Sequence, residues 1–228
     1  MFDTFLFGAF PYLAFALAIG GGLYRYYRDR FTFSSFSSQL VDRRMLFWGS
    51  VPWHYGIVIL LVGHLIGLVM PGWVGDFNGS PLRLYLLEAT AFGLGILALV
   101  GIAVLILRRM TSSYAAAVTS GMDALLLFLL LVQVLAGLYT AVFHRWGSWW
   151  YVSNAVPYLW SLVTLTPQID YARTLPFVTQ IHVINAFLLV AVFPFSRLVH
   201  IFTLPITYLW RPYITVVWNR PARRIDEM

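Results

Sequence analysis

The sequence predicts an all-α membrane protein that crosses the bilayer five times. Of its 228 residues, 60% are hydrophobic and 11% are charged, whereas a soluble domain carries about 25% charged residues. A helix needs about 20 apolar residues to cross the hydrocarbon layer. Five stretches meet this requirement, roughly Phe5–Tyr24, Val51–Met70, Leu84–Leu107, Ala124–Phe143 and Phe177–Phe202. We therefore expect residues 1–228 to form a single membrane-embedded domain.

The arginines predict how this bundle is oriented. Asp3, and no basic residue, precedes the first stretch, so we expect that stretch to remain as a membrane anchor and not to be a cleaved signal. Twelve of the 15 arginines follow the first or third stretch or belong to the C-terminal end from Arg197 onward, and only Arg83, Arg145 and Arg173 fall on the other side. Because cytoplasmic loops are enriched in basic residues, we expect the N-terminus outside and the C-terminus inside.

The longest outside segment runs from His144 to Leu175 and is rich in tryptophan and tyrosine. Such rings prefer the headgroup layer of a membrane. We expect this segment to lie there, with its rings at the membrane surface: Trp146, Trp149, Trp150, Tyr151, Tyr158 and Trp160.

Four of the five histidines lie within or at the edges of the apolar stretches. His54 and His64 belong to the second stretch, and His182 and His200 belong to the fifth, which runs in the opposite direction. This topology places His54 with His200 near the inner face and His64 with His182 near the outer face. Since an ionisable residue within a membrane span is a functional-site candidate, we interpret these pairs as metal ligands.

The spacing along each helix constrains the pairing. His182 and His200 are 18 residues apart, five full turns, so they share one face of an unbroken α-helix. His54 and His64 are 10 residues apart. The axial separations are about 27 Å on the fifth helix and about 15 Å on the second. We expect helix tilt, or a bend near Pro194, to absorb the difference.

The residue types favour haem as the metal group. The chain has no cysteine, which excludes thiolate-bound clusters and covalent haem attachment. A zinc or di-iron site needs three or more converging ligands, but each depth offers two histidines. Two b-type haems, each held by two imidazoles, fit better, and Gly56, Gly63 and Gly67 would let the macrocycle approach the backbone. The alternative is that the histidines only pack and form hydrogen bonds. His144, at the end of the fourth span beside Arg145, we interpret as a residue of the membrane interface.

The chain resembles the gamma subunit of membrane-bound respiratory nitrate reductase, a di-haem cytochrome b, over nearly its whole length. The histidine spacing and several short motifs carry this resemblance. The motifs are Ser37-Ser38-Gln39-Leu40 with Asp42-Arg43, Gly63-His64, Thr119-Ser120-Gly121 with Asp123, Phe193-Pro194-Phe195-Ser196-Arg197-Leu198-Val199-His200, and Pro205 with Tyr208-Leu209.

The resemblance implies the quinol-oxidising electron-transfer subunit of a quinol:nitrate oxidoreductase in the cytoplasmic (inner) membrane of a prokaryote. The outer haem b, matching His64 and His182, takes electrons from quinol. The inner haem b, matching His54 and His200, passes them to an iron–sulfur beta subunit on the inner face. Arg197 is a candidate for a propionate contact, or else extends to the inner surface. Nitrate is reduced in a molybdenum-containing alpha subunit. The remaining partner is the lipid bilayer, and we expect no nucleic acid.

The resemblance also implies a quinol site beside the outer haem, at Gly63 and His64 and a basic residue just before the third span. The family has a lysine there, whereas this chain has Arg83 with Tyr85 close by, and the sequence leaves open which of the two takes that role. Arg83 could donate to a quinone carbonyl or anchor the helix among lipid headgroups. Glu88 is either a proton acceptor or a surface carboxylate.

Two other functions stay open at the level of sequence. The same type of cytochrome b could serve another molybdenum or sulfur-cycle oxidoreductase, including a nitrite-oxidising enzyme with reversed electron flow. The chain could instead be a transporter or structural anchor whose histidines bind no haem, and a purified protein without haem absorbance would favour that function.

Overall fold

The computed structural model describes residues 1–29 and 43–203, and this part of the chain is helical without any strand. Five helices are long and apolar enough to cross a membrane, which confirms the predicted number. The motif at residues 37–43 lies outside the described residues except for the backbone of Arg43, and so do Pro205, Tyr208 and Leu209.

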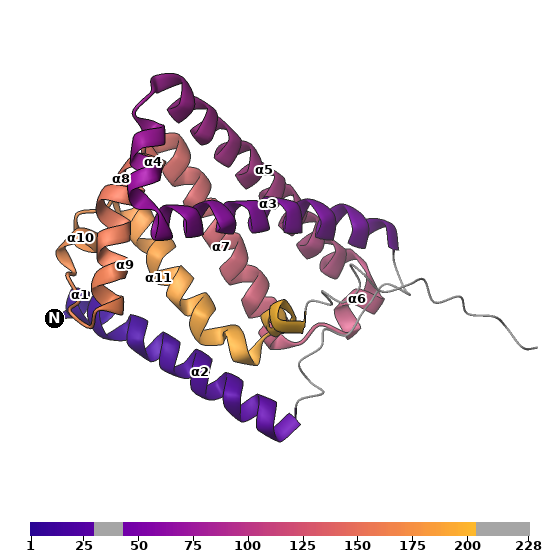
Figure 1. Cartoon of the computed structure of the whole chain (residues 1–228). Helices are drawn as coiled ribbons and strands as arrows, with labels where there is room; N and C mark the ends of the chain where they lie inside the picture. The colour runs from indigo at the N-terminus through magenta and orange to yellow at the C-terminus, as the bar shows by residue number, and fades with distance from the viewer. Residues whose placement is uncertain (30–42, 204–228) are drawn as a thin grey trace, which may run out of the picture.

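The five spans include all the long helices, and shorter helices connect them (Figure 1). The first span consists of α1 (Phe2–Thr4), the π-helical turn η1 (Phe5–Ala9) and α2 (Phe10–Asp29). The next three are α3 (Arg43–Val69), α5 (Pro81–Thr111) and α7 (Gly121–Phe143). The fifth is α11 (Phe177–Val192), followed by the 3-10 turns η4 (Phe193–Phe195) and η5 (Arg197–Thr203). The connecting helices are α4 (Pro71–Asn78), α6 (Ser113–Ala117), α8 (Gly147–Trp150), η3 (Tyr151–Ala155), α9 (Val156–Val163) and α10 (Asp170–Arg173).

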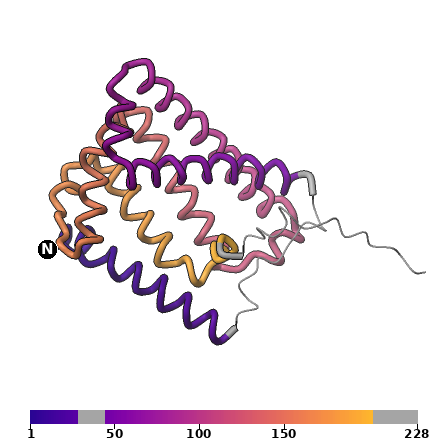
Figure 2. Tube along the Cα trace, in the orientation of Figure 1, coloured from indigo at the N-terminus to yellow at the C-terminus, as the bar shows by residue number. Residues whose placement is uncertain are grey.

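The long helices pack side by side in the order α3, α5, α7, α11, α2. Figures 1 and 2 show that the N-terminus, α4, α8, α9 and α10 gather at one end of the bundle, which we call the loop end. The other end, which we call the arginine end, holds α6 and the described arginines Arg25, Arg28, Arg108, Arg109 and Arg197.

The contact between α3 and α5 depends on glycine. A Cβ atom added at Gly101 of α5 would lie 2.7 Å from Trp53 Cα and 2.8 Å from Gly49 O of α3. A Cβ atom at Gly56 would lie 2.7 Å from Leu94 O of α5. Small residues let membrane helices approach this closely. Gly56 therefore packs against α5, and the expectation that it makes room for a macrocycle is wrong.

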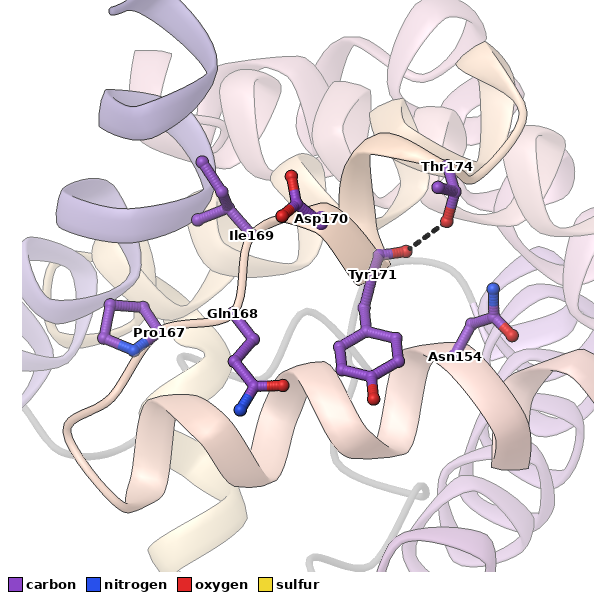
Figure 3. Close-up of a pocket in the computed structure, with 7 residues that line it drawn as sticks. All are labelled: Asn154, Pro167, Gln168, Ile169, Asp170, Tyr171 and Thr174. Carbon is purple, nitrogen blue, oxygen red and sulfur yellow. Dashed lines mark hydrogen bonds between the residues drawn. The ribbon is translucent and has the colours of Figure 1, made fainter.

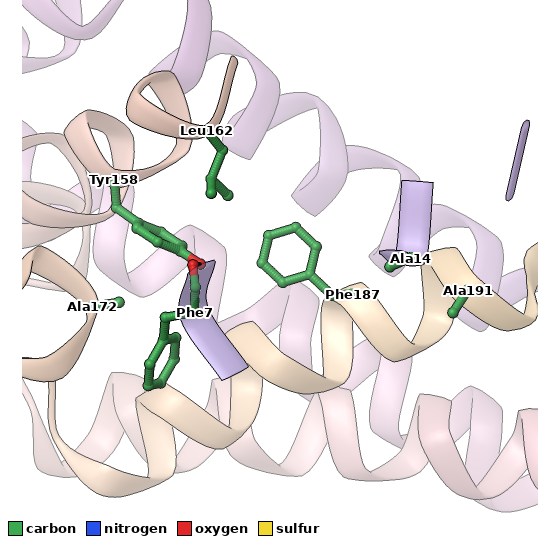
Figure 4. Packing of buried hydrophobic residues seen from close by; sticks show 7 residues of the cluster. All are labelled: Phe7, Ala14, Tyr158, Leu162, Ala172, Phe187 and Ala191. Atoms are coloured by element: carbon green, nitrogen blue, oxygen red, sulfur yellow. Dashed lines mark hydrogen bonds between the residues drawn. The ribbon is translucent and has the colours of Figure 1, made fainter. Parts of the chain in front are cut away.

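The segment between the fourth and fifth spans helps to form the core (Figure 4). Tyr158 of α9 is 1% exposed, and its hydroxyl donates to Phe7 O at 2.7 Å. Its ring also meets the Phe7 ring edge-on. Tyr158 is thus a core residue and not the surface residue that the composition of this segment predicts, whereas Trp149 and Trp160 are exposed.

The fifth span is not one continuous α-helix. Pro194 has no amide hydrogen, so it cannot donate to Val190 O in the preceding turn. The α-helix ends at Val192, and Ser196 is extended, with φ −107° and ψ 177°. The predicted bend near Pro194 is confirmed. The count of five full turns between His182 and His200 is wrong, because it assumes α-helical geometry throughout.

Candidate functional site

Two pairs of histidines lie between the second and fifth spans. The ring centres of His54 and His200 are 6.1 Å apart, with their planes at 79°. His64 and His182 lie on the same two spans, each nearer the loop end. The structure thus brings together His54 and His200, as the topology predicts. We call His54 and His200 the arginine-end pair, and His64 and His182 the loop-end pair.

All four histidine rings share one hydrogen-bond pattern. In each ring, Nδ1 lies 2.6–3.0 Å from a backbone carbonyl oxygen. The acceptors are Ser50 O for His54, Leu60 O for His64, Gln133 O for His182 and Arg197 O for His200. Because a carbonyl only accepts, Nδ1 carries the proton and Nε2 keeps the lone pair that a metal requires. Metal-bound histidines almost always have such a contact on the other ring nitrogen.

The separation within the arginine-end pair fits a shared metal ion. Bonds between a metal and an imidazole nitrogen are about 2.0–2.1 Å long, so two imidazoles on opposite sides of one ion have ring centres about 6 Å apart. The rings of His54 and His200 are separated by this amount. Within residues 1–29 and 43–203 no three His, Cys, Asp or Glu side chains form a group that could hold a metal ion. Haem iron needs only two ligands from the protein, so His54 and His200 fit haem.

The residues that contact the His182 ring lie on α7, and the sequence did not reveal them. Gln133 O accepts from His182 Nδ1 at 3.0 Å, and the Gln133 side-chain nitrogen lies 3.2 Å from His182 Nε2. Asn185, which is buried, donates to Gln133 Oε1 at 2.7 Å and so orients this amide. A Cβ atom at Gly137 would lie 3.1 Å from His182 Cε1. Metal binding at His182 Nε2 therefore requires the Gln133 amide to turn aside.

Tyr151 is the main neighbour of His64, and sequence reasoning missed it as well. Its hydroxyl donates to His64 O at 2.9 Å, and its ring lies edge-on to the imidazole at 5.3 Å between centres. Burial raises the pKa of Tyr151 to about 12, so the hydroxyl stays protonated at neutral pH. The ring fills the space beside Gly67, where a Cβ atom would lie 2.7 Å from it. Gly63, in contrast, is exposed and faces open space.

Arg83 is bound to the end of α4. Its Nε donates to Phe77 O at 2.8 Å and its Nη2 to Asp76 O at 3.0 Å, and the guanidinium lies over the Phe77 ring. A cation is favourable at the C-terminal end of a helix. These contacts give Arg83 a structural role, while Tyr85 packs edge-on against Trp146.

Glu88 joins α5 to α8. Its Oε1 accepts from the backbone nitrogen of Ser148 at 2.8 Å and from the Ser148 hydroxyl at 2.7 Å. The same hydroxyl accepts from the side chain of Asn78 at 3.2 Å. The carboxylate therefore accepts from a backbone donor at the start of α8. It links two helices, whereas the sequence suggested either a proton acceptor or a surface carboxylate.

The other predicted residues lie at helix ends. Arg197 forms a bidentate ion pair with Asp123, with distances of 2.7 and 2.8 Å. His144 ends α7, and its carbonyl oxygen accepts from Trp150 Nε1. The hollow shown in Figure 3 contains none of the predicted site residues; it is lined by Asn154, Pro167, Gln168, Ile169, Asp170, Tyr171 and Thr174.

Comparison with known proteins decides the family. The sequence profile described as "Nitrate reductase gamma subunit" matches residues 3–219. The chain belongs to this family. It is 32% identical to the nitrate reductase gamma chain of Bacillus subtilis (strain 168), covering 94% of this chain and 97% of that protein. It is 34% identical to the respiratory nitrate reductase 1 gamma chain of Escherichia coli (strain K12), covering 92% and 95%.

A third relative has a different length. The chain is 35% identical to the nitrate reductase-like protein NarX of Mycobacterium tuberculosis (strain CDC 1551 / Oshkosh), covering 94% of this chain but 34% of that protein. As a nitrate reductase gamma subunit, the chain is a membrane subunit of an oxidoreductase complex and associates with other nitrate reductase subunits.

Proposed function

We propose that this gamma subunit is a di-haem cytochrome b that oxidises quinol near the loop end and delivers electrons to an iron–sulfur subunit at the arginine end. One observation carries the proposal. Histidines lie at two depths on α3 and on the fifth span, and every ring has its Nδ1 bound to a backbone carbonyl oxygen. This arrangement leaves Nε2 of each ring with the lone pair that a metal requires.

The arginines support the orientation of the proposal. The arginine end holds the five arginines that define it, and basic residues are retained on the cytoplasmic side. The loop end then faces outward, and the iron–sulfur and molybdenum-containing subunits bind on the inner face. The chain accordingly resides in the cytoplasmic (inner) membrane of a prokaryote, and nitrate is reduced in the molybdenum-containing subunit.

The four histidines hold the cofactors in this proposal. His54 and His200 would hold the haem at the arginine end, and His64 and His182 would hold that at the loop end. Two bound haems b would supply one-electron transfer at two depths of the membrane. The carbonyl contacts at Nδ1 fix each imidazole and raise its basicity, and such contacts tune the reduction potential of the bound iron.

The quinol site follows from the open side of the loop-end pair. Oxidation of a quinol to a quinone releases two electrons and two protons. Gly63 leaves the backbone beside His64 accessible, and Tyr151 closes the other side through its contacts with His64 and Gly67. We place quinol against Gly63 and His64, with its protons released outside. Arg83 contributes by holding the end of α4 beside this site.

A spectrum and one substitution test the proposal. The purified complex should contain two b-type haems for each gamma chain, and a colourless preparation would contradict the proposal. His64→Ala should remove the loop-end haem and quinol oxidation, but leave nitrate reduction from an artificial donor to the soluble subunits. Persistent quinol oxidation in this variant would show that the loop-end assignment is wrong.

His144→Ala is the matched control. It also removes an imidazole near the loop end, but from the end of α7, where the ring lies 6.0 Å from the Tyr139 ring and the backbone oxygen accepts from Trp150 Nε1. It should keep both haems and full quinol oxidation. Equal losses in both variants would mean that the loss reflects folding and not ligation.

A further inference from the structure

His200 lies in a segment that has left the α-helix, so its position needs a separate explanation. It belongs to η5, after the break at Pro194 and the extended Ser196. The hydrogen bonds of α11 end at Val192 and cannot orient a ring eight residues later. Yet the His200 ring lies 6.1 Å from that of His54. Other contacts must hold the segment in place.

An ion pair with α7 holds the segment that follows the break in the fifth span. Arg197 Nε donates to Asp123 Oδ1 at 2.7 Å, and its Nη2 donates to Asp123 Oδ2 at 2.8 Å and to Val118 O at 2.9 Å. Asp123 is 4% exposed. Bidentate pairs of this kind fix geometry as well as adding energy, and the gold coil of η5 lies beside the start of α7 in Figure 1.

Asp123 is itself fixed within α7. Its backbone nitrogen donates to the Ser120 hydroxyl at 3.2 Å, and its Oδ2 accepts from the Ser120 backbone nitrogen at 2.9 Å, which is a capping box. On the opposite side, Arg25 of α2 donates to Pro194 O at 2.6 Å and to Ser196 O at 3.2 Å. The segment that precedes His200 is thus held from two helices.

The side chain of Arg197 is held by Asp123, and the carbonyl oxygen of Arg197 in turn orients His200. Arg197 O accepts from His200 Nδ1 at 2.6 Å. The Nδ1 contacts of the other three histidines differ from that of His200. The acceptors of His54 and His64 lie four residues earlier in the same α-helix, and the acceptor of His182 lies on α7. Only the orientation of His200 depends on a residue of a 3-10 turn.

We propose that Asp123 and Arg197 are positioning residues for His200, and thereby for the haem at the arginine end. This inference rests on the proposed function. The ion pair fixes the Arg197 backbone, and the Arg197 carbonyl fixes the His200 ring and its tautomer. Loss of such an outer contact typically weakens metal binding about 10–100-fold. Arg197 therefore acts through its partner Asp123, which differs from a direct contact with a propionate.

Asp123→Asn in the complete complex tests the proposal, with electron paramagnetic resonance and a redox titration of each haem as readouts. His200→Ala first identifies the signals of the arginine-end haem. We expect Asp123→Asn to shift or remove those signals and to leave the loop-end signals unchanged. Arg197→Lys should act in the same direction, because an ammonium cannot make the two parallel hydrogen bonds.

Two controls separate positioning from stability. Ser112→Ala removes the cap of α6, where the Ser112 hydroxyl accepts from Ala115 N at 3.3 Å, but keeps the pair of Asp123 with Arg197. Asp3→Asn breaks the exposed pair of Asp3 with Arg173, where N and O lie 3.1 Å apart, at the loop end. Both controls should keep the native signals. The proposal is overturned if Asp123→Asn keeps both signals, or if Ser112→Ala changes them equally. A wild-type complex without haem overturns the proposed function instead.

Discussion

Gly101→Ala is expected to move the helix that carries two of the four histidines. Gly101 of α5 faces the backbone of α3, and the added Cβ atom would lie 2.7 Å from Trp53 Cα and 2.8 Å from Gly49 O. Neither neighbour is the end of a flexible side chain, so rotamer changes cannot relieve the contact. The two helices must separate.

The size of the effect follows from these distances. Ordinary van der Waals contact begins at 3.4 Å, so the contact with Trp53 Cα falls short by 0.7 Å. Overpacking of a well-packed core costs about 1–3 kcal/mol. Trp53 directly precedes His54, so the displacement moves His54 relative to His200. We expect a lower unfolding temperature together with weaker retention of the arginine-end haem.

Gly93→Ala is the matched comparison, since it lies on the same helix but an added Cβ atom has no neighbour within 4 Å. Thermal unfolding of the purified complex and haem content per chain should be measured for both variants. Gly93→Ala should behave as wild type. If the two variants unfold at the same temperature with the same haem content, the close approach of α3 and α5 does not position His54.

Two further substitutions address the loop end. Tyr151→Phe keeps the ring beside Gly67 but removes the donor to His64 O, so the free energy of unfolding should fall by about 0.5–1.5 kcal/mol. The KM for quinol should rise more than kcat falls. An unchanged KM would exclude Tyr151 from the quinol site. Glu88→Gln removes the charge but keeps an acceptor for Ser148. If Glu88 only caps α8, the pH profile of quinol oxidation will be unchanged, whereas a shifted profile would identify Glu88 as a proton acceptor.

The number of spans and the pairing of His54 with His200 could be predicted because each depends only on the order of residues along the chain. Five apolar stretches of sufficient length define five crossings, and chain direction then assigns His54 to His200. Pro194 also carried a local signal, since it lacks an amide hydrogen, and the helix ends two residues before it.

The residues that contact the histidine rings could not be predicted, because these contacts depend on how each helix is rotated about its axis. Gln133 meets His182 from another helix, and Tyr151 meets His64 from a connecting segment. Periodicity places residues on a face of their own helix but does not say which residues of a neighbour that face meets. For the same reason Gly56 was assigned to a macrocycle, although it faces α5.

The packing of the first span against the last has a consequence for the timing of assembly. A ribosome adds about 5–20 residues each second from the N-terminus, so α2, α3, α5 and α7 are complete before His182 or His200 exists. Each histidine pair of the proposed function draws one ring from α3 and one from the fifth span, and α2 also packs against α11. A nascent chain of four helices therefore contains no complete pair, and ligand binding by both histidines of a pair can follow only when the fifth span has docked.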